Sequence, residues 1–202
     1  QPQPQPLREE LNVSADSPPI PRWPDSFAAN FTETTCGDDG SMAQHQGSVQ
    51  YDYASRRQVI RRQMSRLNPI CNEIKPNRTT PCVHHIHNGS RWVDWPAEND
   101  CVLHCTQGCG VLKPDWVTTV PYFYTGKRLI SGVSCLTWFV QSATPDRFAS
   151  TASGQVCELY DGGADFTDDN PFQWSVLPAS YRTTADPLEM VLPPACTQAA
   201  YR

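Results

Sequence analysis

Apolar and polar residues alternate in several short runs along the chain, which is the period of strands with one buried face. The run 27–32, for example, places Phe27, Ala29 and Phe31 on one side of an extended strand. Similar alternation, or a short apolar run between turn residues, predicts strands over residues 47–53, 56–63, 83–87, 91–95, 116–124, 128–140, 155–160 and 172–177.

Turn residues separate these runs about every ten residues. Asn88-Gly89 is a strong hairpin signal, and Thr125-Gly126-Lys127 is a second candidate. The best helix candidate is 101–112, and we find no amphipathic helix longer than two turns. This pattern predicts a mostly β fold, an antiparallel sandwich or a half-barrel, stapled by disulfides.

The first 24 residues differ from the rest of the chain because Gln1-Pro2-Gln3-Pro4-Gln5-Pro6 is a dipeptide repeat and four more prolines follow. Alternating proline favours an extended polyproline II arm. Such an arm is either a free tail or a segment that docks on its own domain or on a neighbouring molecule. We therefore predict an arm over 1–24, a β domain over 25–202, and an extended C-terminal strap around 187–194.

The composition narrows the class of protein. Hydrophobic residues make up 39% and charged residues 18% of the 202 positions, and the formal net charge is −5. A coiled coil requires a richer supply of Ala, Glu, Lys and Leu, and a nucleic-acid-binding protein requires a basic surface. No apolar run approaches the roughly 20 residues of a membrane span. We expect no nucleic-acid partner and no membrane span.

Nine cysteines point to an oxidising compartment and a disulfide framework, since a zinc-binding intracellular protein would need paired C-x-x-C elements that this sequence lacks. The simplest count is four bridges, each contributing about 2–4 kcal/mol, with one cysteine that is free or pairs between chains. Connectivity does not follow from the sequence. The cysteines are Cys36, Cys71, Cys82, Cys101, Cys105, Cys109, Cys135, Cys157 and Cys196.

Four N-x-[ST] sequons point to N-glycosylation in the secretory pathway. Their acceptor residues are Asn12, Asn30, Asn77 and Asn88. We predict an extracellular glycoprotein whose signal peptide has been removed, with O-glycans on prolines as a further expectation.

Candidate catalytic and metal sites are weak. His85 and His87 share one strand face, as two zinc ligands would, but the sequence identifies no third ligand, so an exposed strand is the competing interpretation. Ser134 fails the nucleophile-elbow pattern and receives no catalytic role. We therefore expect no metal and no enzyme activity; an enzyme acting on cell-wall carbohydrate would need paired carboxylates at a suitable separation.

Calcium is the one cofactor that the sequence leaves open. Acidic clusters occur at Asp38-Asp39 and at Asp165, Asp168 and Asp169. Carboxylates clustered in a loop suit calcium, although a solvated acidic loop is the alternative.

Several features, in order, resemble the ependymin-related family of secreted glycoproteins, whose fold is similar to that of LolA-type lipoprotein carriers. They are the segment Gly47-Ser48-Val49-Gln50-Tyr51-Asp52 before a basic strand, Arg91-Trp92-Val93-Asp94 ahead of Cys101, Trp138 followed by Cys157, and Asp186-Pro187 with Pro193-Pro194-Ala195-Cys196.

The resemblance implies two curved antiparallel sheets around an apolar cleft. It also implies bridges from Cys101 to Cys196 and from Cys36 to Cys157. The family is associated with hydrophobic ligands, with calcium and with dimers.

Two functions follow as hypotheses. The first is a secreted structural subunit that assembles into a filament or matrix when the arm of one copy docks on the sheet edge of the next. The second is a soluble carrier that binds a lipid or other hydrophobic ligand in a β cleft lined by some of the tryptophans. A cleft filled entirely by its own side chains would count against the carrier.

Overall fold

The computed structural model describes residues 18, 22–36, 42–141, 145–161 and 172–199; for Cys36, Pro145, Asp161 and Phe172 only the backbone is described. Nearly all of the predicted arm and both predicted acidic clusters therefore lie outside the described residues, and so does Asn12.

Eleven strands form one antiparallel sheet, so the fold is mostly β as predicted, and of half-barrel rather than sandwich type. The sheet order is β6-β5-β4-β3-β2-β1-β11-β10-β9-β8-β7. The strands are β1 (Ser26–Cys36), β2 (Met42–Asp52), β3 (Arg57–Arg62), β4 (Cys82–His87), β5 (Ser90–Trp95), β6 (Asp100–Cys105), β7 (Tyr122–Ile130), β8 (Val133–Gln141), β9 (Pro145–Ser150), β10 (Val156–Asp161) and β11 (Phe172–Val176).

Two meanders make up this sheet, β1 to β6 and β7 to β11, and the pairing of β1 with β11 joins them. The resemblance implied two sheets, and here the structure differs because this pairing makes the ladder continuous. Residues 106–121 connect one edge of the sheet to the other, since β6 and β7 are the two end strands; we call them the crossover segment.

The helices are short and serve as connections. Asn68 caps α1 (Pro69–Ile74) by accepting a hydrogen bond from the Cys71 amide, and Pro69 suits the first helical position. No helix in the described ranges is long and apolar enough to cross a bilayer. The others are η1 (Ser65–Leu67), η2 (Pro96–Glu98), η3 (Trp116–Thr119), η4 (Pro178–Ser180), η5 (Pro187–Met190) and α2 (Pro194–Thr197).

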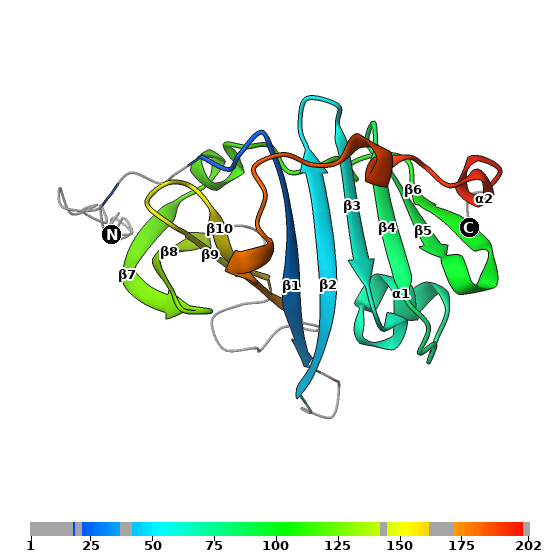
Figure 1. Ribbon diagram of the computed structural model, residues 1–202, viewed down its shortest axis with the longest axis horizontal. Coiled ribbons are helices and arrows are strands. Elements are labelled where there is room, and N and C mark those ends of the chain that lie inside the picture. Colours follow the sequence, from blue (N-terminus) through cyan, green and yellow to red (C-terminus); the bar gives the residue numbers. More distant parts are fainter. Residues whose placement is uncertain (1–17, 19–21, 37–41, 142–144, 162–171, 200–202) are drawn as a thin grey trace, which may run out of the picture.

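The sheet curls around its main hydrophobic core, as Figure 1 shows for the strands on either side of β1 and β2. The ring of Trp23 lies 5.6 Å from that of Tyr51 on β2 and 6.0 Å from that of Phe148 on β9. In a flat sheet these strands, four spacings apart, would be about 19 Å from each other. The core therefore fills a concave face, with Phe27, Ala29, Phe31, Val49, Tyr51, Ile60, Trp138, Val140, Phe148, Trp174 and Val176 on it.

The C-terminal segment 177–196, which includes the predicted strap of 187–194, crosses the opposite, convex face (Figure 1). Within the predicted range the chain is not extended throughout, because residues 187–190 form η5. Arg182 pairs with Ala28 through an isolated bridge, and Met190 packs against Val59 and Val83. A disulfide from Cys196 to Cys101 closes it. We use the name strap for the whole segment 177–196.

The hairpin prediction at Asn88-Gly89 is confirmed, with φ values of 50° and 86° that suit this dipeptide. The helix predicted over 101–112 is wrong, because Asp100–Cys105 pairs with β5 as strand β6. The turn predicted at Thr125–Lys127 is also wrong: Gly126, at φ 117°, marks a bulge inside β7, and the chain reverses at Ser131-Gly132.

Four disulfides lie within the described part of the chain. They join Cys71 to Cys82, Cys101 to Cys196, Cys105 to Cys109, and Cys135 to Cys157. The bridge from Cys101 to Cys196 is the one that the family resemblance implied. The implied bridge from Cys36 to Cys157 is wrong, because Cys157 on β10 is bonded to Cys135 on β8, two strands away in the same sheet.

Candidate functional site

The concave face carries a cluster of aromatic rings centred on Phe148. Trp23, Trp116 and Trp138 each place a ring about 6 Å from Phe148. Trp23 also meets Tyr51 edge-on, a preferred geometry for aromatic pairs. We call these five residues the aromatic interior.

Three hydrogen-bond donors in the aromatic interior lack an acceptor. The indole Nε1 atoms of Trp23, Trp116 and Trp138 are buried and have no hydrogen-bond partner among the described residues. A buried polar group without a partner costs about 1–3 kcal/mol, and most such groups in folded proteins are satisfied. Three such donors lie within this one apolar cluster.

The cover of the aromatic interior comes from loop residues and the short helix η3, and not from a further sheet or a long helix. The Tyr51 hydroxyl donates to the Leu112 carbonyl at 2.7 Å, and the Trp23 amide donates to the Pro114 carbonyl at 3.0 Å. Val117 of the crossover segment is buried in the same core. Two isolated hydrogen bonds and one buried side chain thus hold the crossover segment over the concave face, without a continuous ladder of backbone hydrogen bonds.

Beside the aromatic interior, a buried ion pair lies in the concave face. Glu33 Oε2 is 2.7 Å from Arg62 Nε and 2.7 Å from His45 Nε2, and the Trp174 indole donates to Glu33 Oε1 at 2.9 Å. Burial alone would raise the pKa of Glu33, but the charge of Arg62 and the donated hydrogen bonds outweigh it and hold the pKa at about 2. Glu33 is therefore an ionised structural anchor.

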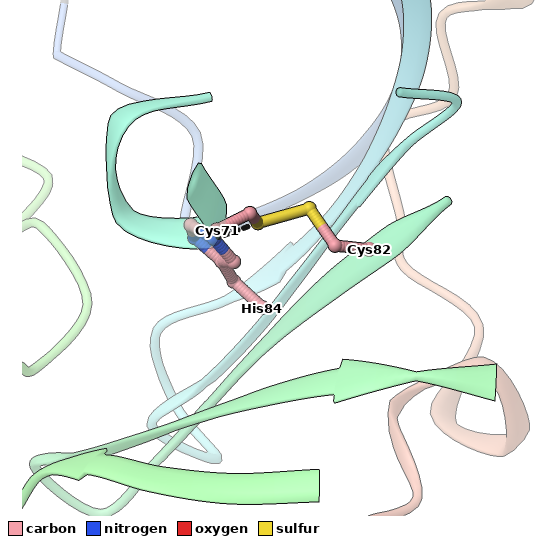
Figure 2. A group of neighbouring side chains, drawn as sticks. All are labelled: Cys71, Cys82 and His84. Carbon is pink, nitrogen blue, oxygen red and sulfur yellow. Dashed lines mark hydrogen bonds between the residues drawn. A yellow bond between two sulfur atoms is a disulfide. The ribbon is translucent and has the colours of Figure 1, made fainter. Parts of the chain in front are cut away.

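His84 completes this polar region, next to a disulfide. Figure 2 shows its ring beside the bridge from Cys71 to Cys82, with Nε2 3.2 Å from Cys71 Sγ. Nδ1 lies 3.4 Å from Arg62, whose guanidinium can only donate, so Nδ1 accepts and the ring proton sits on Nε2. Burial, with the charges of Arg62 and Arg91, lowers the pKa of His84 well below its usual value, so the ring is neutral.

Cys71, Cys82 and His84 are close enough to hold a metal ion, but their chemistry argues against it. Both sulfurs are engaged in the disulfide, and a thiolate is the form that binds metal. A metal on Nε2 would also push the ring proton to Nδ1, directly against the Arg62 donor. The group is a structural cluster.

The histidines that the sequence singled out do not form a common site. His85 lies on the convex face with Nε2 3.6 Å from Asp94, and His87 accepts a hydrogen bond from Arg57 at 3.3 Å. Cys196 approaches His85 and Asp94, but its sulfur is bonded to Cys101. His85 and His87 thus share a strand face, but each has a different partner and they do not form a pair of metal ligands.

Grooves on the convex face are lined by both polar and apolar groups. One of about 440 Å³ is lined by Asn30, Gln46, Ser48 and Arg61, among others, and one of about 400 Å³ lies beneath the strap. A third, of about 260 Å³, is lined by Thr125, Arg128, Thr137, Phe139, Arg147, Phe148 and Glu158.

The remaining predicted positions are accounted for as follows. Asn30, Asn77 and Asn88 are exposed, as glycan acceptors must be. Ser134 lies within β8.

The sequence interpretation missed Glu33 and Arg62. The alternation that places Phe27, Ala29 and Phe31 on one face also places Glu33 there, so the signal was present in the pattern.

The fold and this site define a class, an open antiparallel half-barrel with an aromatic concave face. No protein-family model and no curated protein matches the chain. Among solved structures, it is similar to an uncharacterized conserved protein from Thermus thermophilus, at 10% identity and a TM-score of 0.53 over 88% of this chain and 90% of that one. At this identity the likeness establishes the fold alone.

Two further likenesses are more distant. A LolA superfamily protein, NE2245 from Nitrosomonas europaea, is 11% identical with a TM-score of 0.40, over 86% of this chain and 93% of that one. MucB is 9% identical with a TM-score of 0.46, over 85% of this chain and 58% of MucB. We build no argument on these two.

Proposed function

We propose that this protein is an extracellular binding protein that carries a lipid or similar apolar ligand against the aromatic interior. The observation that carries the proposal is the set of three unpartnered indole donors in a covered apolar cluster. A ligand with an apolar body and oxygen acceptors, such as a fatty acyl compound, would satisfy both features.

The described side chains pack the aromatic interior closely, so a ligand cannot simply enter it. Trp23 and Val117 are both buried, and exposing each costs about 1.5–3 kcal/mol. Binding therefore requires that the crossover segment and Trp23 move aside and that the ligand replace their contacts. An open form of this kind would be a minor population until a ligand stabilises it.

The first experiment extracts the protein purified from its natural source with organic solvent and identifies any released compound by mass spectrometry. We expect a lipid-like compound near one equivalent per chain.

The second experiment titrates the emptied protein with a fluorescent acyl probe. The variant W138F removes one interior donor and should weaken binding about 2- to 12-fold, the value of one hydrogen bond. W92F, on the convex side of β5, is the matched control and should bind like wild type. If nothing is extracted and no apolar probe binds, the carrier function is wrong.

Secretion and N-glycosylation belong to the same proposal. The four disulfides fit an oxidising compartment, and the three described sequon asparagines are exposed. Treatment of the natural protein with an N-glycosidase should lower its mass. Membership in the ependymin-related family is part of the proposal too, supported by the Cys101 to Cys196 bridge.

A further inference from the structure

Arg91 lies on the same concave face as the aromatic interior. The strand register places Tyr51 opposite Gln58, Gln58 opposite Ile86, and Ile86 opposite Arg91, so all four form one row across β2 to β5. Three strand spacings separate Tyr51 from Arg91, which is about 14 Å. The row thus runs from an aromatic ring, past an amide and an aliphatic side chain, to a cation.

No carboxylate among the described residues pairs with Arg91. Its Nε is buried and makes no hydrogen bond there. Other arginines of the sheet do have partners: Arg62 meets Glu33, Arg61 meets Glu189, and Arg128 meets Glu158. Arg91 is therefore a partly buried cation whose charge the described residues do not balance. Arg147 also has a buried Nε without a hydrogen bond, but its guanidinium lies over the Tyr160 ring, 4.4 Å from the ring centroid.

The surroundings of Arg91 make this imbalance worse. Burial lowers the pKa of Arg91, and the nearby charge of Arg62 lowers it further. His84 is neutral, and Arg62 already has its carboxylate. A desolvated cation without a partner is costly, and an anion with acceptor oxygens would relieve that cost.

We propose that Arg91 binds the acidic head group of the ligand, which makes the ligand class a long-chain carboxylate. Its apolar tail would run along the row past Ile86 and Gln58 towards Tyr51 and the aromatic interior. This inference rests on the proposed function and adds to it the charge and polarity of the ligand. Arginine suits the role because its fork of donors matches a carboxylate in two places.

The test compares hexadecanoate with its methyl ester, at pH 7, on the emptied full-length protein. The two probes share a tail and differ in head-group charge. Wild type should bind the acid about tenfold more tightly or better, since a hydrogen bond to a charged group is worth at least that factor. R91Q should lose this preference and leave the affinity for the ester unchanged.

Two more variants separate the head-group role from other effects. R66Q removes the same charge from an exposed position and should keep the preference of wild type. R91K retains the charge but not the fork of donors, so it should keep part of the preference. R91Q should unfold at a temperature no lower than wild type, because the removal of an unpaired buried charge does not destabilise a fold.

Each remaining outcome overturns the inference. Equal binding of acid and ester to wild type, with both bound, would refute the head-group role and leave the carrier function standing. A preference that survives in R91Q would refute Arg91 as its source, and an R91Q that fails to fold would show that Arg91 has a structural partner. If neither probe binds to wild type, both the head-group role of Arg91 and the carrier function are refuted.

Discussion

At the scale of the residue, a few polar side chains inside the concave face decide how this protein responds to pH. Glu33 is fully buried and holds together Arg62, His45 and Trp174. Its pKa of about 2 lies below the ordinary 4.5, so the folded state favours the ionised carboxylate more than the unfolded state does. The resulting stability is complete above pH about 4.5 and is lost as the pH falls towards 2.

The variant E33Q tests this account. It should lower the free energy of unfolding at pH 7 by about 3 kcal/mol, because Arg62 is left buried without its carboxylate. The difference between wild type and E33Q should shrink as the pH falls from 4.5 to 2. Urea denaturation at pH 7, 4 and 2.5 measures both effects.

The control for E33Q is E73Q, an exposed position on α1, which should match wild type at each pH. A difference between wild type and E33Q that stays constant with pH would contradict the assigned role of the ionised carboxylate.

At the scale of the element, the strap is held by one long-range disulfide and by contacts with the convex face. The bridge between Cys101 and Cys196 spans 95 residues, whereas that between Cys105 and Cys109 spans 4. A long closed loop restricts the unfolded chain more than a short one. The strap also makes polar contacts, since Glu189 lies 3.3 Å from Arg61 and the Asp186 amide donates to Gln50.

Two double-serine variants compare these bridges. Removal of Cys101 and Cys196 should lower the free energy of unfolding by about 4–5 kcal/mol, and removal of Cys105 and Cys109 by about 2 kcal/mol. Chemical denaturation measures the two losses, and hydrogen exchange should increase along 177–196 in the first variant only. Equal losses would show that loop entropy does not govern these bridges.

At the scale of the whole molecule, the half-barrel leaves two end strands, β6 and β7, and an open sheet edge can accept a strand from another chain. The predicted assembly through the N-terminal arm fits such an edge, but the arm lies outside the described residues and assembly stays a prediction. Trp23, near the end of the segment predicted as the arm, packs in the core.

Light scattering on the glycosylated protein tests assembly. If the arm joins copies, the full chain should form polymers, and a variant that lacks residues 1–22 should be monomeric. This deletion retains Trp23 and its hydrogen bond to Pro114, so the core stays intact. A full chain that is monodisperse, with and without reductant, would rule out the filament.

Sequence by itself determined several of the strands and their faces, but it missed β6 and β9, predicted strand where residues 116–119 form η3, and ran the end of β7 and nearly the whole of β8 together as one strand. Alternation placed Phe27, Ala29 and Phe31 on one side, and Asn88-Gly89 predicted its hairpin, because both signals depend on local backbone geometry. Prediction from the sequence failed where local signals compete. Gly126 is typical of a turn but occupies a bulge in β7. Residues 101–112 could not be assigned to strand or helix without knowledge of the pairing with β5.

Only the tertiary structure decided what the concave face contains. The pairing of β1 with β11 joined the two meanders, and the curl of the sheet gathered Trp23, Trp116 and Trp138 around Phe148 from distant parts of the chain. The buried ion pair depends on tertiary structure too, because the register of β1, β2 and β3 brings Glu33 and Arg62 together. Partners that lie far apart in sequence meet through strand pairing, and no local pattern records which residues those will be.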